Sequence, residues 1–507
     1  MSFNLATILH ETALATPDAT VYTFMGSGTS YRELDEQSGR FAAGLLENGL
    51  RPGQVVAVQL PNLPQFLTCY FGALKAGMLL LPLNPLLKAP EIEYHLADSD
   101  AALMVGFDSI HAEAAKACEL LGVPLYLVSF SQDALPEGTR PVSELISSAP
   151  LIEPGGDIRA CNSDDTAVLI YTSGTTGKPK GAELTHFELY MNCTVSGHLF
   201  GARRDDVSLA VLPFFHVFGL SSVLNVAVRY GGALAIVPRF EPGAVLDVLE
   251  QERCSIIAGV PTMLQALANQ HTSGRDLSRL RVAVSGGASL PEDVLASFES
   301  IFGIRVLEGY GLSETASTTS FNRPDDRRAL SVGKPIWGVQ MRVVDENDQP
   351  MPPGRDNVGE ILIRGHNVMK GYLGKPEATE ATLRGGWLHT GDLGYQDEDG
   401  FYFIVDRAKD LVIRGGYNVY PREIEEVLFA HPGIAEAAVI GKPDERLGEE
   451  VVAVVVSRPG VELTGQDVIA YCKERLAAYK YPREVRFLPE LPKGPTGKIL
   501  KQDLRSG

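Results

Sequence analysis

The sequence contains few cysteines, and no two of them are close together. Its six cysteines stand at positions 69, 118, 161, 193, 254 and 472 of a chain of 507 residues. Zinc sites and disulfide frameworks need cysteines at short or regular spacings, such as Cys-x-x-Cys. The sequence indicates neither a zinc site nor a disulfide framework, and the cysteines are expected to be reduced, mostly structural thiols.

Positive charge is also scarce. The chain has 45 Lys and Arg against 63 Asp and Glu, which gives a formal net charge of −18. Nucleic-acid-binding surfaces need basic patches because they face a phosphate backbone. A main function in nucleic-acid binding is therefore not expected, although local basic sites can still occur.

Long hydrophobic runs are missing as well. The most apolar window, 69–87, is interrupted by Lys75, Pro82 and Pro85, which favours a buried helix and strand over a membrane span. The first residues lack the basic and apolar regions of a secretory signal. We therefore expect a cytoplasmic protein without integral membrane contact. Peripheral contact with a membrane and assembly into a homodimer are both compatible with the sequence.

The composition, with 45% hydrophobic and 21% charged residues, is that of a soluble globular protein, and the length favours two or more domains. Up to about Pro335, short β-rich runs alternate with helical segments, which predicts an α/β fold of parallel sheets covered by helices. The predicted strands include 55–60, 78–83, 209–212, 234–237, 256–259 and 282–285. Residues 338–405 have the turn spacing of hairpins in a small β-unit. A new α+β unit is expected after a boundary at 406–410.

The most informative segment is 171–181, Tyr-Thr-Ser-Gly-Thr-Thr-Gly-Lys-Pro-Lys-Gly. Its glycines expose backbone N–H groups, and its hydroxyls and lysines suit a nucleotide triphosphate. It is not a Walker A loop, because only two residues separate Gly174 from Gly177 and Pro179 follows Lys178. Lysines and a fixed proline also argue against a flexible linker. We expect it to join a strand at 166–171 to a helix that Thr185 and Glu188 cap.

Four further motifs carry polar groups suited to the same chemistry. Glu308-Gly-Tyr-Gly-Leu-Ser-Glu314 follows an apolar run and offers a carboxylate for Mg²⁺. Ser285-Gly-Gly-Ala288 permits close approach, and Ser289 with Glu292 forms a second capping-box pattern. Trp387-Leu-His-Thr-Gly-Asp392 ends in a bidentate acceptor. Lys498 stands in a loop framed by proline and glycine, which could carry its cation into a cleft.

Taken together, these motifs resemble those of the adenylate-forming superfamily, which contains acyl-CoA synthetases, amino-acid adenylation domains and beetle luciferases. The resemblance covers almost the whole chain. It implies a large N-terminal domain (1–406) with a small β-barrel-like unit, a hinge (407–410) and a small C-terminal lid domain (411–507). It also implies ATP, Mg²⁺ and coenzyme A, and a lid that rotates between adenylation and thioester formation.

The resemblance implies a role for each motif residue. Lys498 would bridge the carboxylate and ATP, His216 would contact the carboxylate, and Lys409 would be the hinge. Thr172 and Glu314 would hold the metal ion. The nucleotide site would comprise Thr172, Ser173, Gly174, Thr175, Thr176, Gly177, Lys178, Lys180, Gly287, Ala288, Glu308, Gly309, Tyr310, Gly311, Ser313, Asp392, Arg407 and Lys498. The acyl pocket would comprise Phe215, His216, Phe218, Gly286, Gly287 and Gly311, and the coenzyme A tunnel Gly415 and Gly416.

The acid is expected to be apolar and free of an amine. Amino-acid adenylation domains place an aspartate near the start of their pocket, and 213–220 contains no acidic residue. A medium- or long-chain fatty acid is favoured, and arylpropenoic acids stay open. Coenzyme A is the favoured acceptor. The alternatives are a fatty-acyl-AMP ligase that serves a carrier protein and a nucleotide-binding regulator without turnover.

Overall fold

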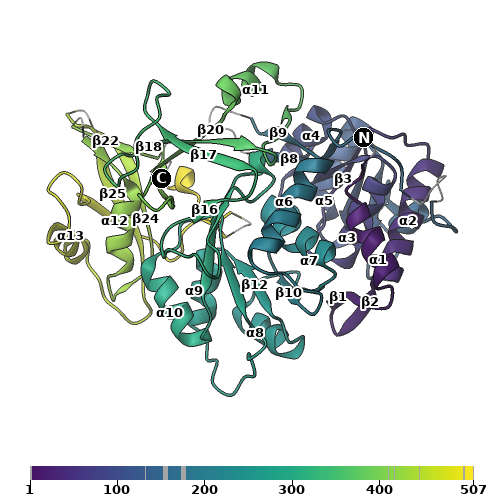
Figure 1. Cartoon of the computed structure of the whole chain (residues 1–507), viewed down its shortest axis with the longest axis horizontal. Helices are drawn as coiled ribbons and strands as arrows, with labels where there is room; N and C mark the ends of the chain where they lie inside the picture. Colours follow the sequence, from purple (N-terminus) through teal and green to yellow (C-terminus); the bar gives the residue numbers. More distant parts are fainter. Residues whose placement is uncertain are drawn as a thin grey trace.

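The computed structural model describes residues 3–131, 133–151, 158–172, 178–408, 410–415, 417–444, 446–494 and 497–505. Figure 1 shows mixed sheets covered by helices, with the C-terminal residues in a smaller unit on the left. The predicted α/β fold with a second, smaller α+β unit is confirmed. Among the described helices, none combines the length and the apolar character needed to cross a bilayer.

A first sheet forms the centre of the molecule, and its middle strands run parallel. Its order is β16-β15-β14-β13-β12-β10-β11-β1-β2. The strands are β1 (Thr20–Phe24), β2 (Ser27–Ser30), β10 (Val207–Ala210), β11 (Ala233–Ile236), β12 (Ile256–Gly259), β13 (Val282–Ser285), β14 (Val306–Tyr310), β15 (Ser320–Phe321) and β16 (Lys334–Pro335). Ligands of such sheets bind beyond the carboxyl ends of the parallel strands.

A second sheet has the order β19-β9-β8-β4-β3-β5-β6-β7. Its strands are β3 (Val55–Val58), β4 (Leu79–Pro82), β5 (Ala101–Phe107), β6 (Leu125–Val128), β7 (Arg140–Pro141), β8 (Thr166–Thr172), β9 (Lys180–Thr185) and β19 (Gly371–Tyr372). Strands β8 and β9 are antiparallel, with Thr172 opposite Lys180. The glycine-rich loop therefore connects two strands of a hairpin. The prediction that it leads directly into a helix was wrong, because β9 intervenes.

Helices cover both sheets, and α6 (His186–Leu199) lies between them in Figure 1. The expected capping box of α6 is confirmed, since Thr185 N donates to Glu188 Oε2 (2.8 Å) and Glu188 N to Thr185 Oγ1 (3.2 Å). The other helices here are α1 (Thr7–Ala15), α2 (Tyr31–Glu47), α3 (Pro64–Lys75), α4 (Ala89–Asp98), α5 (His111–Leu121), α7 (Val226–Tyr230), α8 (Pro242–Gln251), α9 (Pro261–Ala268), α10 (Glu292–Phe302), α11 (Pro376–Thr382) and the π-helix η3 (Phe218–Asn225). The capping box expected at Ser289 was wrong, because α10 starts only after Pro291, which makes no side-chain cap.

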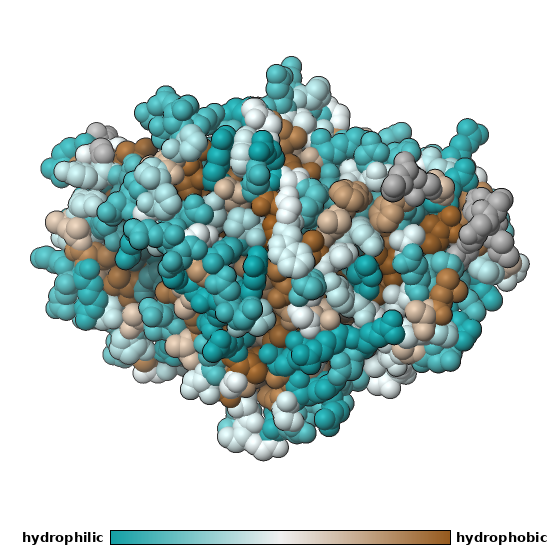
Figure 2. All heavy atoms as spheres, viewed as in Figure 1, coloured by the Kyte–Doolittle hydropathy of each residue, from teal (hydrophilic) through white to brown (hydrophobic). Residues whose placement is uncertain are grey.

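Two smaller sheets complete the fold. The predicted β-unit is an antiparallel sheet of β17 (Val339–Val344), β18 (Gly359–Gly365), β20 (Leu388–Gln396) and β21 (Tyr402–Arg407). The C-terminal unit has its own apolar core, packed between β22 (Val412–Arg414), β23 (Tyr417–Val419), β24 (Ile434–Asp444), β25 (Gly448–Ser457), β26 (Glu484–Phe487), α12 (Pro421–Phe429), α13 (Gly465–Lys473) and α14 (Lys501–Arg505). Figure 2 shows a mostly hydrophilic face, as expected for a strongly acidic chain.

Candidate active site

A large cavity of about 1060 Å³ lies beyond the carboxyl ends of β10, β12, β13 and β14. Strand β8 with the start of β9 borders it on one side, and β20 and β21 on another. The C-terminal unit contributes Lys498 to its wall. The loop that carries Lys498 is held against α9, where Thr262 Oγ1 donates to Gly497 O (3.3 Å). Segments from both large sheets, the small β-unit and the C-terminal unit therefore meet around one space.

Asp392, Arg407 and Tyr310 form one hydrogen-bonded group at the cavity. The β20–β21 hairpin pairs Asp392 with Arg407, whose Nε lies 3.0 Å from Asp392 Oδ1. The Tyr310 hydroxyl donates to Asp392 Oδ2 (2.6 Å). Asp392 raises the pKa of Arg407, and burial together with Asp392 raises the pKa of Tyr310. Tyr310 and Arg407 line the cavity, and the buried Asp392 lies behind them.

Oxygen atoms suited to a magnesium ion gather at the end of β8. Thr172 Oγ1 donates to Glu314 Oε1 (3.2 Å), and the Tyr372 hydroxyl donates to the same oxygen (2.9 Å). Lys180 Nζ lies 5.0 Å from the centre of the Tyr372 ring. All four residues line the cavity. Carboxylate and hydroxyl oxygens are the hard ligands that Mg²⁺ prefers, so these residues fit that ion.

Sequence reasoning did not find Tyr372. It reaches the site because the two-residue strand β19 pairs with β9, which sets Tyr372 opposite Ala182. Burial, followed by the charge of Glu314, raises the pKa of the Tyr372 phenol, which therefore stays a hydrogen-bond donor at neutral pH. Its side chain fixes the orientation of the Glu314 carboxylate.

Another part of the cavity wall, around His216 and Phe218, is aromatic. His216 Nδ1 accepts a hydrogen bond from Phe218 N (3.2 Å), so the ring proton is on Nε2. Burial, and then the Lys498 cation, lowers the pKa of His216 to about 4, and the imidazole is neutral at pH 7. A Cβ on Gly286 would lie 3.2 Å from the Phe218 ring, so the glycine leaves room for close packing there.

The cavity continues from this wall into the first sheet. It reaches from Leu212 back to Ser208 on β10, and from Val260 back to Ile256 on β12. Four residues of extended chain span about 13 Å. The inner part is lined mainly by aliphatic and aromatic side chains, among them Phe200, Leu209, Val223, Ala258, Val284 and Phe321. A long and mostly apolar group can be accommodated there.

Many of the predicted site residues meet in this cavity. Those on its wall are Thr172, Lys180, Phe215, His216, Phe218, Gly286, Gly287, Gly309, Tyr310, Gly311, Ser313, Glu314, Arg407 and Lys498. Ser173, Gly174, Thr175, Thr176, Gly177, Lys409 and Gly416 lie outside the described residues.

Among the described residues, five predicted ones are not on the cavity wall, and one of them is the buried Asp392 described above. Glu308 lies within β14, and its Oε1 accepts a hydrogen bond from Leu290 N (3.2 Å). Lys178 Nζ lies 5.1 Å from the centre of the Tyr94 ring. Ala288 and Gly415 do not line the cavity either. The structure thus gives no direct contact between Glu308 and the cavity, because its carboxyl is buried behind the strand.

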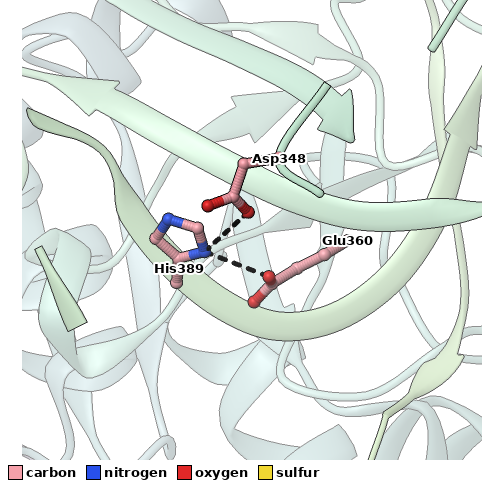
Figure 3. Close-up of side chains that lie close together, drawn as sticks. All are labelled: Asp348, Glu360 and His389. Carbon is pink, nitrogen blue, oxygen red and sulfur yellow. Dashed lines mark hydrogen bonds and ion pairs between the residues drawn. The ribbon is translucent and has the colours of Figure 1, made fainter. Parts of the chain in front are cut away.

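A cluster at the cavity rim was also missed. His389 Nδ1 lies 3.1 Å from Glu360 Oε2 and 4.0 Å from Asp348 Oδ1 (Figure 3). Three such groups could hold a metal ion. Here, however, Arg384 pairs with both carboxylates, at 3.5 Å and 3.9 Å. Glu360 also accepts a hydrogen bond from Gly391 N (2.9 Å), so the cluster supports the turn that precedes Asp392.

Known proteins share this architecture and much of the sequence. The family model of the AMP-binding enzymes matches residues 9–373, and that of their C-terminal domain matches residues 423–498. A long-chain-fatty-acid–CoA ligase of Bacillus subtilis is 36% identical over 99% of this chain and 94% of its own. A feruloyl-CoA synthase of Amycolatopsis is 39% identical over 97% of this chain and 96% of its own.

A solved structure is similar along the whole chain. MatB from Rhodopseudomonas palustris with bound ATP has a TM-score of 0.91 at 34% identity, and covers 100% of this chain and 99% of its own. The apo structure of the same protein gives a TM-score of 0.79.

The chain therefore belongs to the AMP-binding enzyme family. The names of its relatives confirm the predicted acid–CoA ligase branch. Enzymes of that branch use ATP and coenzyme A as reactants and Mg²⁺ as the metal ion, as expected from the sequence.

Proposed function

We propose that the protein joins a carboxylic acid with a mostly apolar acyl group, preferably a medium- or long-chain fatty acid, to coenzyme A through an acyl-adenylate. The observation that carries this proposal is the single cavity that connects three kinds of group. They are the oxygen atoms of Thr172 and Glu314, the side chains of Tyr310 and Arg407, which would face the nucleotide, and the apolar inner pocket.

In the first half-reaction, the acid carboxylate attacks the α-phosphorus of ATP and pyrophosphate leaves. Thr172 and Glu314 would hold Mg²⁺, which neutralises phosphate charge when bound. Lys180 and Lys498 face the cavity as cations and would stabilise the charge that develops during transfer. His216 is neutral and can donate through Nε2, so it would orient the carboxylate and reduce its nucleophilicity less than a positively charged imidazolium would.

In the second half-reaction, the thiol of coenzyme A attacks the acyl carbon and AMP leaves. We propose that residues 411–507 rotate about a hinge at 407–410 before this step. The rotation would withdraw Lys498 and bring Gly415 toward the site. The present structure is more similar to ATP-bound MatB, with a TM-score of 0.91, than to apo MatB, with 0.79. This difference supports assigning the present arrangement to the adenylation state.

An arylpropenoic acid is the second candidate. It is favoured by the similarity to a feruloyl-CoA synthase and by the aromatic residues Phe200, Phe218 and Phe321 on the pocket wall. The depth of about 13 Å along β10 and the aliphatic lining support the fatty acid.

The test is a panel of straight-chain and arylpropenoic acids, supplied with ATP and Mg²⁺, with and without coenzyme A. We expect a coenzyme A thioester and AMP in equal amounts. Formation of AMP that never requires coenzyme A would favour a ligase that serves a carrier protein. Failure of every acid to support pyrophosphate exchange would instead indicate a regulator without turnover.

A further inference from the structure

Several hydroxyl groups interrupt the apolar lining of the acyl pocket, and three of them lie together. Ser222 Oγ of η3 lies 2.7 Å from Ser317 Oγ and 3.2 Å from Thr318 Oγ1, and all three residues line the cavity. We call Ser222, Ser317 and Thr318 the hydroxyl cluster. Three hydroxyls carry three protons, and the two hydrogen bonds use two of them. One proton is left for a group outside the cluster.

The chain is held in an unusual conformation to place this cluster. Ser317 has a φ of +107° and Ala316 a φ of +52°, values that side-chain-bearing residues rarely adopt. The buried Asn192 of α6 fixes the segment, since its Nδ2 donates to Thr318 O (2.8 Å) and its Oδ1 accepts from Thr318 N (3.3 Å). Backbone strain of this kind persists where a functional geometry requires it.

A further hydroxyl on the cavity wall, that of Ser196, has no hydrogen-bond partner among the described residues. Ser196 follows Asn192 by one turn and lies on the same face of α6. Its side chain is 3% exposed, and its Oγ makes no hydrogen bond. Ser196 also lines the cavity. A buried hydroxyl without a partner is uncommon in a folded protein, and a polar group of a bound molecule beside Ser196 would satisfy it.

An unsubstituted hydrocarbon group would give these hydroxyls no hydrogen-bond partner. It would displace water from the pocket and offer no hydrogen-bonding atom to Ser196 or to the spare proton of the hydroxyl cluster. Sites built to bond a polar group discriminate strongly against analogues that lack it, since their own polar atoms then stay unpaired.

We propose that the natural acid carries a hydroxyl, alkoxy or oxo substituent on its acyl group, and that Ser222 of the hydroxyl cluster and Ser196 recognise this oxygen. The inference rests on the proposed function and narrows its substrate class. It applies to oxygenated fatty acids and to oxygenated arylpropenoic acids alike, because both present an oxygen atom in an otherwise apolar group.

The test compares matched acids that differ only by one oxygen, such as octanoate with hydroxyoctanoates, and cinnamate with hydroxy- and methoxycinnamates. We measure kcat/KM for thioester formation by the full-length enzyme. The wild type is expected to prefer an oxygenated acid by about tenfold or more in at least one pair. Ser222→Ala and Ser196→Ala should each reduce that ratio several-fold, and they should act mainly on the oxygenated acid.

Ser38→Ala is the matched control. Ser38 is also fully buried, and its hydroxyl donates to Leu34 O within α2, away from the cavity. The control should keep the wild-type ratio. A wild type that prefers the plain acid in every pair, or an unchanged ratio in both pocket variants, would overturn the inference while thioester is still made. Absence of thioester with every acid would overturn the proposed function itself.

Discussion

Replacing Lys498 by alanine should separate the two half-reactions of the proposed mechanism. Among the described residues of the C-terminal unit, Lys498 alone lines the cavity, and its charge contributes to the low pKa of His216. One electrostatic contact made in the transition state contributes about 10² or more to kcat, or roughly 3 kcal/mol. Acid-dependent pyrophosphate exchange should fall by that factor. Thioester formation from preformed acyl-adenylate should be nearly unaffected, because the proposed rotation withdraws Lys498 before that step.

Lys493→Ala provides the control within the same loop. Lys493 pairs with Glu436 (2.6 Å) and does not contribute to the cavity wall. Both half-reactions should stay close to the wild-type rates in this variant. The reasoning is refuted if Lys498→Ala slows the two half-reactions equally, or if Lys493→Ala has the same effect as Lys498→Ala.

Three further substitutions test the groups around the cavity. Tyr372→Phe removes a donor to Glu314 and should weaken Mg²⁺-dependent ATP binding about tenfold, as measured by titration calorimetry at several Mg²⁺ concentrations. Tyr310→Phe keeps the ring but removes the hydrogen bond to Asp392, and should raise the Kd for AMP about tenfold in the absence of metal. Burial raises the pKa of Glu308 from 4.5 to about 7. The folded state therefore holds this proton more tightly than the unfolded chain, and the free energy of unfolding should fall as pH rises from about 4.5 to 7. Glu308→Gln should remove that part of the pH dependence. At pH 8 its free energy of unfolding, measured by chemical unfolding, should exceed that of the wild type by up to about 3 kcal/mol.

Tyr402→Phe controls for the loss of a buried phenol hydroxyl elsewhere. Tyr402 donates to Met341 O (2.7 Å) in the β-unit, and its loss should reduce stability but leave nucleotide binding unchanged. Equal nucleotide affinities in all three tyrosine variants would contradict the roles given to Tyr372 and Tyr310. For Glu308, a stability difference that stays the same at pH 5 and pH 8 would contradict the buried, protonated carboxyl.

The sequence predicted the layers of the fold because short β-rich runs and capping residues mark its elements locally. Strands β12 and β13 lie at the predicted positions 256–259 and 282–285, and α6 begins where Thr185 indicated. The hairpin after the glycine-rich loop was missed. Residues 180–185 mix small, charged and polar side chains, so their strand character comes from pairing with β8 and not from their own pattern.

The candidate site could be predicted only where a motif carries its residues. Tyr372 lies 58 residues from Glu314, and the pairing of β19 with β9 brings its hydroxyl to the Glu314 carboxylate. The hydroxyl cluster joins a π-helix to a strained turn 95 residues further along the chain. Glu308 shows the opposite case. Its place beside Gly309 in a motif suggested a contact with the nucleotide, but its carboxyl is buried behind β14 and does not line the cavity.

The central claim is that the acid is activated as an acyl-adenylate before coenzyme A is used. The most direct measurement is a single-turnover experiment in which the enzyme receives ATP, Mg²⁺ and one accepted acid, and coenzyme A only afterwards. The account predicts that acyl-adenylate and pyrophosphate form first in equal amounts, and that coenzyme A then converts the adenylate into thioester and AMP. Formation of ADP, or of thioester without any preceding adenylate, would contradict it.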